Sequence, residues 1–385
     1  MRFYDRDIKL IIFNSDGTLL QLPDSEDEEI EIRFPVKSLF ETLATKEVKT
    51  SLIVIDKENY NWINNQSPIE YLDYLFFLED GDYLKAYSFV MNKFSVTKEE
   101  ILIVCQKLSH YKLAKELGFL AIGMYSYSLR NKESLDDDNC EDYIGDLYDI
   151  RFKIEEQNVL PIFEIENYKV RKFLDGFEIM GIVNYTENLL IPAYIDKKPV
   201  YCVGKDAFDQ MTFKTITFEE GVREIGVFSF HKVKGVQELV IPKSVESMSL
   251  YSFSSSEWEK VTFLGNVSSA FSSFEGCDKL KEIIFPSDFK YIDFRCFWCS
   301  DGLEELFFPE GMEWIGMQAF NNCPNLKTIH LPKSIKMISD NAFYRCPNLN
   351  TVYYNGNKED RDKISINNEE EGNRKLIDAN WIYNE

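Results

Sequence analysis

The feature that most constrains the fold is a phenylalanine that returns every 21 to 23 residues through the second half of the chain. A constant interval of this length indicates one repeated supersecondary unit, and stacking such units buries a continuous core. The chain of 385 residues is also too long for one small core, so two domains are expected. Seven phenylalanines share the interval, each directly after Ala, Ser or Cys: Phe208, Phe230, Phe253, Phe274, Phe297, Phe320 and Phe343.

A second pattern, L-x-x-L-x-L with apolar residues in the leucine positions, runs in step with the phenylalanines and is often closed by proline. It predicts a short strand whose pattern residues face the core, followed by a return segment. The seven turns predict a β-solenoid over 201–355, after a linker and N-terminal cap over 156–200 and before a polar C-terminal cap over 356–385. The pattern begins at Phe213, Val236, Trp258, Leu280, Leu303, Leu326 and Leu349.

The interval and the pattern resemble leucine-rich repeats. More narrowly, PKSIKMISDNAFYRCPNLNTVYYNG (332–356) resembles the BspA-like repeats of bacteria and some protists. Members of that family often carry secretion signals, whereas the opening residues MRFYDRDIKLIIF contain no apolar signal region. We therefore expect a cytoplasmic protein, with a cell-surface adhesin as an alternative.

Strand alternation predicts which repeat residues face away from the core. In one such row, apolar residues recur where folding does not require them, and an exposed apolar stripe beside charges is typical of a protein-binding face. The candidate binding residues, for an unknown protein partner, are Val240, Ile284, Phe307, His330 and Tyr353. A neighbouring row holds Thr215, Glu238, Lys260, Glu282, Glu305, Thr328 and Thr351. The alternative is that the stripe packs on the N-terminal half or on a second copy of the chain.

The repeat cysteines are interpreted as core residues. Cys277, Cys299, Cys323 and Cys346 recur at intervals of 22, 24 and 23, which predicts a ladder of small, soft side chains. Cys296 and Cys299 have C-x-x-C spacing, but a zinc site needs two more ligands at suitable spacing and the sequence offers none. We predict reduced thiols and no metal site.

The first half alternates apolar runs with helix-like stretches. The runs Leu10–Phe13, Leu52–Ile55, Ile101–Val104 and Leu120–Met124 are separated in part by YLKAYSFVMNKF (83–94) and YKLAKELG (111–118). This alternation predicts an α/β domain, a parallel sheet wrapped by helices. Ligands of such sheets bind at the carboxyl ends of the strands, so residues 14–18, 56–59 and 105–110 are expected to converge on one crevice.

This half resembles the haloacid-dehalogenase (HAD) superfamily of phosphatases and phosphotransferases. FNSDGT (13–18) is similar to its first motif, D-x-D-G-[TV], and ILIVCQKLSHYKLAKELGFLAIGM (101–124) follows the frame of its fourth. EDYIGDLYDI (141–150) is similar to the segment that closes that fold. The resemblance implies a HAD-like (Rossmannoid) domain over 1–155. It also implies a first aspartate that attacks phosphorus and binds magnesium, a second that acts as acid and base, and fourth-motif aspartates that hold magnesium.

The departures from those motifs decide the expected chemistry. An amide oxygen is a poor nucleophile, and magnesium prefers hard anionic oxygens. The nucleophile position is Asn14, and the metal positions are Gln106 and His110. We therefore predict a catalytically silent domain, a pseudoenzyme without a cofactor; an acid–base pair of Asp16 and His110 is the remaining alternative. The vestigial positions are Asn14, Asp16, Thr18, Asp56, Gln106 and His110.

Charge narrows the choice of partner. A net charge of −22 disfavours nucleic acid and anionic membrane surfaces, and no apolar run reaches the roughly 18 residues of a membrane span. The preferred hypothesis is an interaction or scaffold protein. The alternative is a divergent magnesium-dependent phosphatase whose repeats present the substrate, and magnesium binding at positions 14, 106 and 110 would distinguish the two.

Overall fold

The computed structural model describes residues 2–3, 6–14, 39–40, 43–44, 47–54, 72–78, 82–105, 107–124, 143–144, 161–267, 269–368 and 371–384. The chain divides into two compact units, Met1–Leu160 and Pro161–Glu385. Each unit has its own hydrophobic core and is described by itself.

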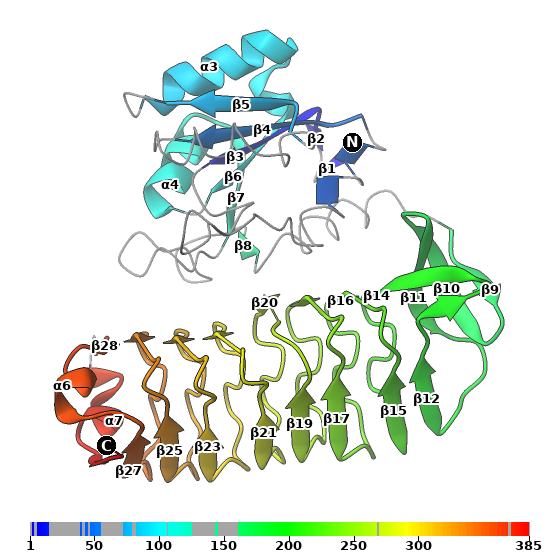
Figure 1. The fold of residues 1–385 in the computed structure, drawn as a ribbon. Coiled ribbons are helices and arrows are strands. Elements are labelled where there is room, and N and C mark those ends of the chain that lie inside the picture. The colour runs from blue at the N-terminus through cyan, green and yellow to red at the C-terminus, as the bar shows by residue number, and fades with distance from the viewer. Residues whose placement is uncertain are drawn as a thin grey trace. The chain divides into compact units, whose positions relative to one another are not determined.

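The N-terminal unit contains a six-stranded parallel sheet in the order β5-β4-β3-β6-β7-β8 (Figure 1). The strand that comes first in this sheet lies in its middle, and later strands are added outward on both sides, as in doubly wound α/β folds. The strands are β3 (Leu10–Asn14), β4 (Lys49–Val54), β5 (Tyr74–Phe77), β6 (Ile101–Cys105), β7 (Leu120–Met124) and β8 (Tyr143–Ile144). A short hairpin of β1 (Arg2–Phe3) and β2 (Arg6–Asp7) precedes them.

Among the described residues of this unit, helices α3 (Tyr83–Phe94) and α4 (Leu108–Glu116) pack on the sheet. Both join one core cluster with alternate residues of β3 and β6, including Ile12 and Ile103. The other residues of these strands are buried as well, so the sheet reads as a continuous apolar run rather than as an alternating one. A short 3₁₀ turn, η2 (Lys98–Glu100), leads from α3 into β6.

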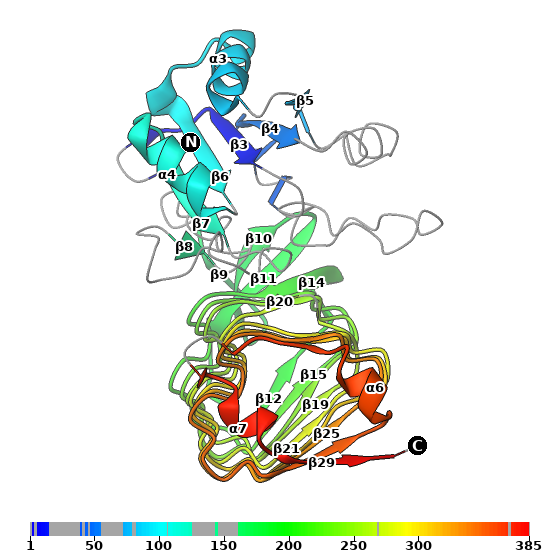
Figure 2. The ribbon, with the colours of Figure 1, turned by 90° about the vertical axis from the view of Figure 1, so that its left-hand side faces the viewer.

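The C-terminal unit begins with antiparallel hairpins and continues as a solenoid. β9 (Phe163–Ile165), β10 (Tyr168–Phe173) and β11 (Gly176–Ile182) form the hairpins, and β11 then pairs in parallel with β14. Viewed along the axis in Figure 2, the turns of the solenoid lie over one another, with the long strands along one side.

Two parallel ladders of strands run along the solenoid. The long strands are β12 (Asn188–Ile191), β15 (Thr215–Phe218), β17 (Glu238–Ile241), β19 (Lys260–Phe263), β21 (Glu282–Ile284), β23 (Glu305–Phe307), β25 (Thr328–Leu331), β27 (Thr351–Tyr354) and β29 (Asn380–Tyr383). The other ladder consists of the six-residue strand β14 (Lys198–Val203) and a series of two-residue strands, β16 (Glu224–Ile225), β18 (Ser247–Met248), β20 (Ser269–Ala270), β22 (Tyr291–Ile292), β24 (Trp314–Ile315), β26 (Met337–Ile338) and β28 (Ser365–Ile366). A two-residue strand, β13 (Tyr194–Ile195), pairs with β14.

The segments expected to be caps also contribute strands to these ladders. In the N-terminal one, β12 pairs in parallel with β15. In the C-terminal one, β28 pairs with β26 and β29 pairs with β27, while α6 (Lys358–Arg361) and α7 (Arg374–Ile377) connect them. The repeat architecture therefore extends into both segments.

The recurring phenylalanines form one buried column, which we call the inner column: Phe208, Phe230, Phe253, Phe274, Phe297, Phe320 and Phe343. Successive rings are stacked with centroids 5.1 to 5.6 Å apart. Each ring lies midway between two residues of positive φ, as Phe297 does between Arg295 (52°) and Cys299 (57°). These tight turns explain why the ring returns at the same place in each repeat.

The predicted cysteine ladder is correct at three positions and wrong at one. Cys277, Cys323 and Cys346 are fully buried, and the thiol of each donates to the carbonyl oxygen of an inner-column phenylalanine in the preceding repeat, at 3.2 to 3.6 Å. The residue three positions after Phe297 is Ser300, which fills the buried position instead of Cys299. Cys299 is half-exposed because it occupies the positive-φ turn one residue earlier.

Candidate functional site

The carboxyl ends of β3 and β6 bring Asn14, one of the motif positions, together with Cys105. Asn14 is the register partner of Cys105, and both are fully buried. The Asn14 amide donates to the Tyr87 hydroxyl, from α3, and to Cys105 Sγ at 3.8 Å. Asn14 is therefore held in a hydrogen-bonded cluster of neutral side chains.

Electrostatics keeps this cluster neutral. Burial raises the pKa of the Tyr87 hydroxyl, and the neighbouring Cys105 thiol raises it further. Within the described part of the chain, Asn14 Oδ1 has no hydrogen-bond partner. An amide, a phenol and a thiol offer no hard anionic oxygen, so these residues do not fit a magnesium ion.

His110 lies in the first turn of α4. Its ring is tilted by 48° against the Tyr83 ring with centroids 4.3 Å apart, and the centroids of Tyr83 and Tyr87 are 5.9 Å apart. The Tyr83 ring thus links His110 to Tyr87 of the Asn14 cluster. The other four motif positions, Asp16, Thr18, Asp56 and Gln106, lie outside the described residues.

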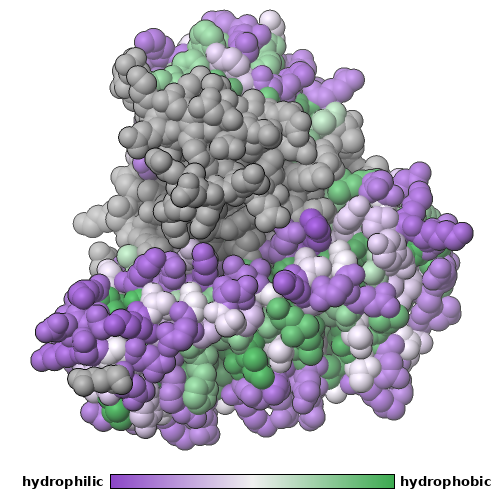
Figure 3. All heavy atoms as spheres, viewed as in Figure 1, coloured by the Kyte–Doolittle hydropathy of each residue, from purple (hydrophilic) through white to green (hydrophobic). Residues whose placement is uncertain are grey.

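The second candidate is the outward side of the long strands, which we call the long-strand face. Here three of the five candidate residues are exposed, Val240 at 46%, Ile284 at 38% and Phe307 at 58%, whereas His330 and Tyr353 are of intermediate exposure. Strand register places Thr262 between Val240 and Ile284, and His330 between Phe307 and Tyr353. Figure 3 shows hydrophobic side chains gathered over these strands between hydrophilic borders.

Three rings at the C-terminal end of this row form a second stack, which we call the outer row. The ring centroids of Phe307 and His330 are 4.1 Å apart, and those of His330 and Tyr353 are 4.7 Å apart, with the planes within 14° of parallel. The Nε2 atom of His330 also lies 2.7 Å from Glu305 Oε1. Because the rings face one another along the solenoid, they present their edges to solvent.

The flanking row carries charge next to the apolar residues. Glu238, Glu282 and Glu305 each lie two residues before an exposed apolar residue of the same strand. Lys260 interrupts the acidic series and forms an ion pair with Glu282 at 2.9 Å. The long-strand face is therefore an apolar stripe with a mainly acidic edge.

Register extends the stripe by two residues that the sequence analysis missed. Leu190 of β12, 40% exposed, is the partner of Thr217, and Ile382 of β29 is the partner of Tyr353. Both belong to segments interpreted as caps. NLLIP (188–192) carries the same alternation and closing proline as the repeats, so its sequence held the signal.

Two further observations concern the described residues. None of the helices among them is long and apolar enough to cross a membrane. Within the same residues, no group of three or more His, Cys, Asp or Glu side chains is arranged to hold a metal ion.

Comparison with known families assigns the repeats. Residues 193–298 and 270–369 match the BspA type leucine rich repeat region, in six copies. The repeat solenoid is therefore of the leucine-rich-repeat type predicted from its interval. No curated protein matches the chain.

Similar solved structures include a leucine-rich repeat protein from Bacteroides ovatus, 17% identical, with a TM-score of 0.32 over 53% of this chain and 66% of that one. The T. pallidum leucine rich repeat protein is 21% identical, with a TM-score of 0.28 over 50% and 71%. The 3-deoxy-D-manno-octulosonate 8-phosphate phosphatase from Yersinia pestis is 18% identical, with a TM-score of 0.24 over 30% and 63%. Similarities of this size assign neither an activity nor a partner.

Proposed function

We propose that this chain, whose C-terminal unit consists of BspA-type leucine-rich repeats, is a non-catalytic interaction protein that binds a protein partner on the long-strand face. The observation that carries the proposal is the exposed apolar stripe. The core of the solenoid does not need Val240, Ile284 or Phe307, since the opposite side of each strand already supplies buried residues. When a partner removes exposed apolar area of this kind from water, the burial stabilises the complex.

The edge-on rings add a reason to expect a protein partner. Stacked Phe307, His330 and Tyr353 leave no open ring face between them, so a sugar ring could not stack there. Ring edges and neighbouring aliphatic side chains suit the apolar side chains of a protein, and aromatic residues are enriched at the centres of such interfaces.

Site-specific photo-cross-linking tests this proposal. A benzophenone amino acid in place of Phe307 should capture a discrete partner in the source cells. The matched control is the same group in place of Tyr344, which is 40% exposed but lies outside the long strands. Equal capture at both positions, or none at Phe307, would contradict a binding site on the long-strand face.

We propose in addition that the N-terminal unit is a HAD-like domain that no longer transfers phosphoryl groups. The central place of β3, with Asn14 at its carboxyl end, supports the resemblance. The buried neutral cluster of Asn14, Tyr87 and Cys105 supports the loss of the reaction, because it supplies neither nucleophile nor metal ligand.

Magnesium-dependent phosphate release from a panel of small phosphorylated metabolites tests this second proposal. The wild type is expected to show no turnover above the level of Asp16→Asn. Turnover that Asp16→Asn abolishes would establish a divergent phosphatase and overturn the proposal.

The proposed function includes a cytoplasmic location. Cell fractionation tests that location, and recovery of the protein at the cell surface would favour an adhesin.

A further inference from the structure

A hollow of about 320 Å³ lies on one side of the solenoid, between the inner-column turns and the long strands. Each repeat has a positive-φ residue two positions after the inner-column phenylalanine, and the first four of these residues line the hollow. The series is Gln210, Lys232, Ser255, Gly276, Cys299, Asn322 and Arg345. The small residues Ser255 and Gly276 come together in the middle of this series, so the side chains around them enclose a space.

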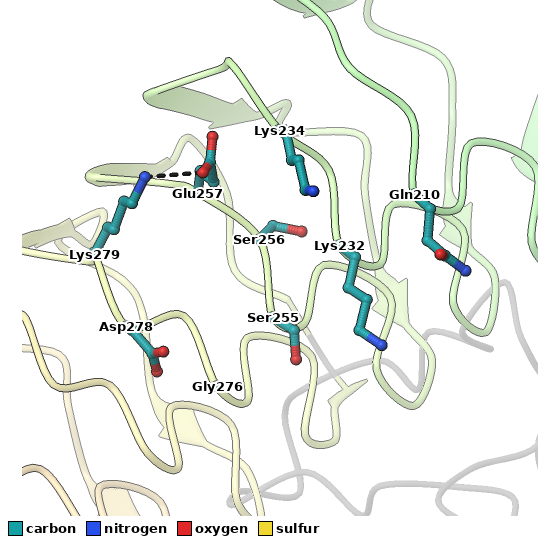
Figure 4. Close-up of a pocket in the computed structure, with 9 residues that line it drawn as sticks. All are labelled: Gln210, Lys232, Lys234, Ser255, Ser256, Glu257, Gly276, Asp278 and Lys279. Atoms are coloured by element: carbon teal, nitrogen blue, oxygen red, sulfur yellow. Dashed lines mark hydrogen bonds and ion pairs between the residues drawn. The ribbon is translucent and has the colours of Figure 1, made fainter.

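Three lysines line the hollow. Figure 4 shows Lys232 and Lys234 on one side and Lys279 on the other, with Ser255 and Ser256 between them. In the described part of the chain, neither Lys232 nor Lys234 forms an ion pair within 4 Å. Other solenoid lysines do form an ion pair with a glutamate of a neighbouring repeat, as Lys281 does with Glu259.

The glutamate in the hollow is already engaged. Glu257 accepts from Lys279 at 2.8 Å and from the Gly235 amide at 3.0 Å (Figure 4). The Lys279 ammonium, then the Gly235 amide and, less strongly, the charge of Lys234 hold the pKa of the Glu257 carboxyl below its usual value. Glu257 therefore stays ionised and forms its ion pair with Lys279, which leaves Lys232, together with Lys234 outside ion-pair distance of Glu257, as the positive side of the space.

Asp278 adds an acceptor on the opposite side. Burial, and then the nearby Asp301 carboxylate, raise the pKa of its carboxyl. A carboxylate beside an anion site repels a second bare anion, but it accepts a hydrogen bond from a hydroxyl group. The hollow thus combines positive charge at one end with a hydroxyl acceptor at the other.

We propose that this hollow binds a small organic oxyanion that also carries hydroxyl groups, such as a sugar phosphate. The anionic group lies between Lys232 and Lys234, and a hydroxyl donates to Asp278. The volume is at the lower limit for small-molecule pockets, so the ligand is a single small metabolite. This site is separate from the long-strand face and stands independently of the proposed function.

Isothermal titration of the full chain at low ionic strength tests the site, with glucose 6-phosphate as the probe. Saturable binding of this probe is expected. It should be stronger than the binding of glucose or of inorganic phosphate, because only the phosphorylated sugar can contact both the lysine side and the Asp278 side of the hollow. The double variant Lys232→Ala/Lys234→Ala should bind at least about tenfold more weakly. The control Lys243→Ala, which changes an exposed lysine outside the hollow, should bind like the wild type.

A second variant separates a binding role from a structural one. Glu257→Gln removes the internal counter-ion of Lys279, so it should bind the probe more tightly than the wild type does. If the ion pair of Glu257 and Lys279 were purely structural, Glu257→Gln would bind the probe no more tightly than the wild type does, and that result would overturn the proposal. The absence of saturable binding, or binding that survives in the double lysine variant, would overturn it as well.

Discussion

Two ring stacks run along the same solenoid with opposite exposure. The inner column has centroids 5.1 to 5.6 Å apart and every ring at most 1% exposed. The outer row of Phe307, His330 and Tyr353 has centroids 4.1 and 4.7 Å apart, yet Phe307 is 58% exposed. Both stacks arise because parallel strands and turns place equivalent residues of successive repeats one strand spacing apart.

The difference lies in what each stack removes from water. The inner rings are buried on all sides by the solenoid itself, so they contribute to folding. The outer rings bury only the faces that they turn to one another, and their edges remain exposed to solvent. A repeat therefore converts the same periodic residue into core or into binding surface, according to the side of the strand or turn on which it lies.

The largest expected effect on the free energy of unfolding comes from a variant of the inner column. Phe297→Ala should lower the free energy of unfolding by about 3–5 kcal/mol, because it leaves a cavity between Phe274 and Phe320. Phe307→Ala, the matched variant of the outer row, should stay within about 0.5 kcal/mol of the wild type. Denaturant unfolding measures both, and equal losses would remove the distinction between the two stacks.

The rule that burial decides a residue's role can also be tested in the N-terminal unit with Asn14→Asp. The new carboxyl would be buried beside Tyr87 and Cys105, so its folded pKa would rise above the unfolded value of about 3.9. The folded state then binds more protons, so the variant is nearest to wild-type stability below about pH 4 and loses stability as the pH rises through the folded pKa. The loss reaches about 1.4 kcal/mol per unit of pKa shift.

Thermal unfolding of Asn14→Asp and wild type between pH 4 and 8 measures this difference. Asn14→Ser is the control, because it shortens the side chain without adding a titratable group. A gap between Asn14→Asp and wild type that does not widen with pH would mean that position 14 tolerates charge, and the neutral-cluster interpretation would be wrong.

A smaller effect concerns the cysteines. Among the seven described, Cys299 is the one that is not buried, so it should react first with a thiol reagent in the native protein. Partial burial and nearby acidic side chains raise the pKa of the Cys299 thiol, so its reaction should accelerate markedly from pH 7 to pH 9. In a Cys140→Ser background, which removes the cysteine outside the described residues, Cys299→Ser should abolish this fast phase, whereas a fast phase that persists would mean that Cys299 is not the most reactive thiol.

Much of the fold followed from periodicity alone. The apolar runs became β3, β4, β6 and β7, and the stretch 83–94 coincides with α3. The exposed row was predicted because strand alternation has a period of two and needs no knowledge of contacts. The prediction that Cys299 is a buried ladder residue was wrong. Cys299 lies one residue before the buried position, and a count of cysteine intervals does not reveal which residue of a turn has positive φ.

The sites were less predictable than the fold. That Asn14 donates to Tyr87 depends on how α3 packs on the sheet, and no local pattern encodes that packing. The lysine hollow depends on Ser255 and Gly276 meeting in adjacent repeats, so it becomes visible only when the repeats are stacked.

The most direct test of the account is the affinity of the partner captured at Phe307, measured for wild type and for Phe307→Ala/Tyr353→Ala. The account predicts at least about tenfold weaker binding, with an unfolding free energy close to that of the wild type. Unchanged affinity in a folded double variant would contradict it, because the outer row would then have no role in binding.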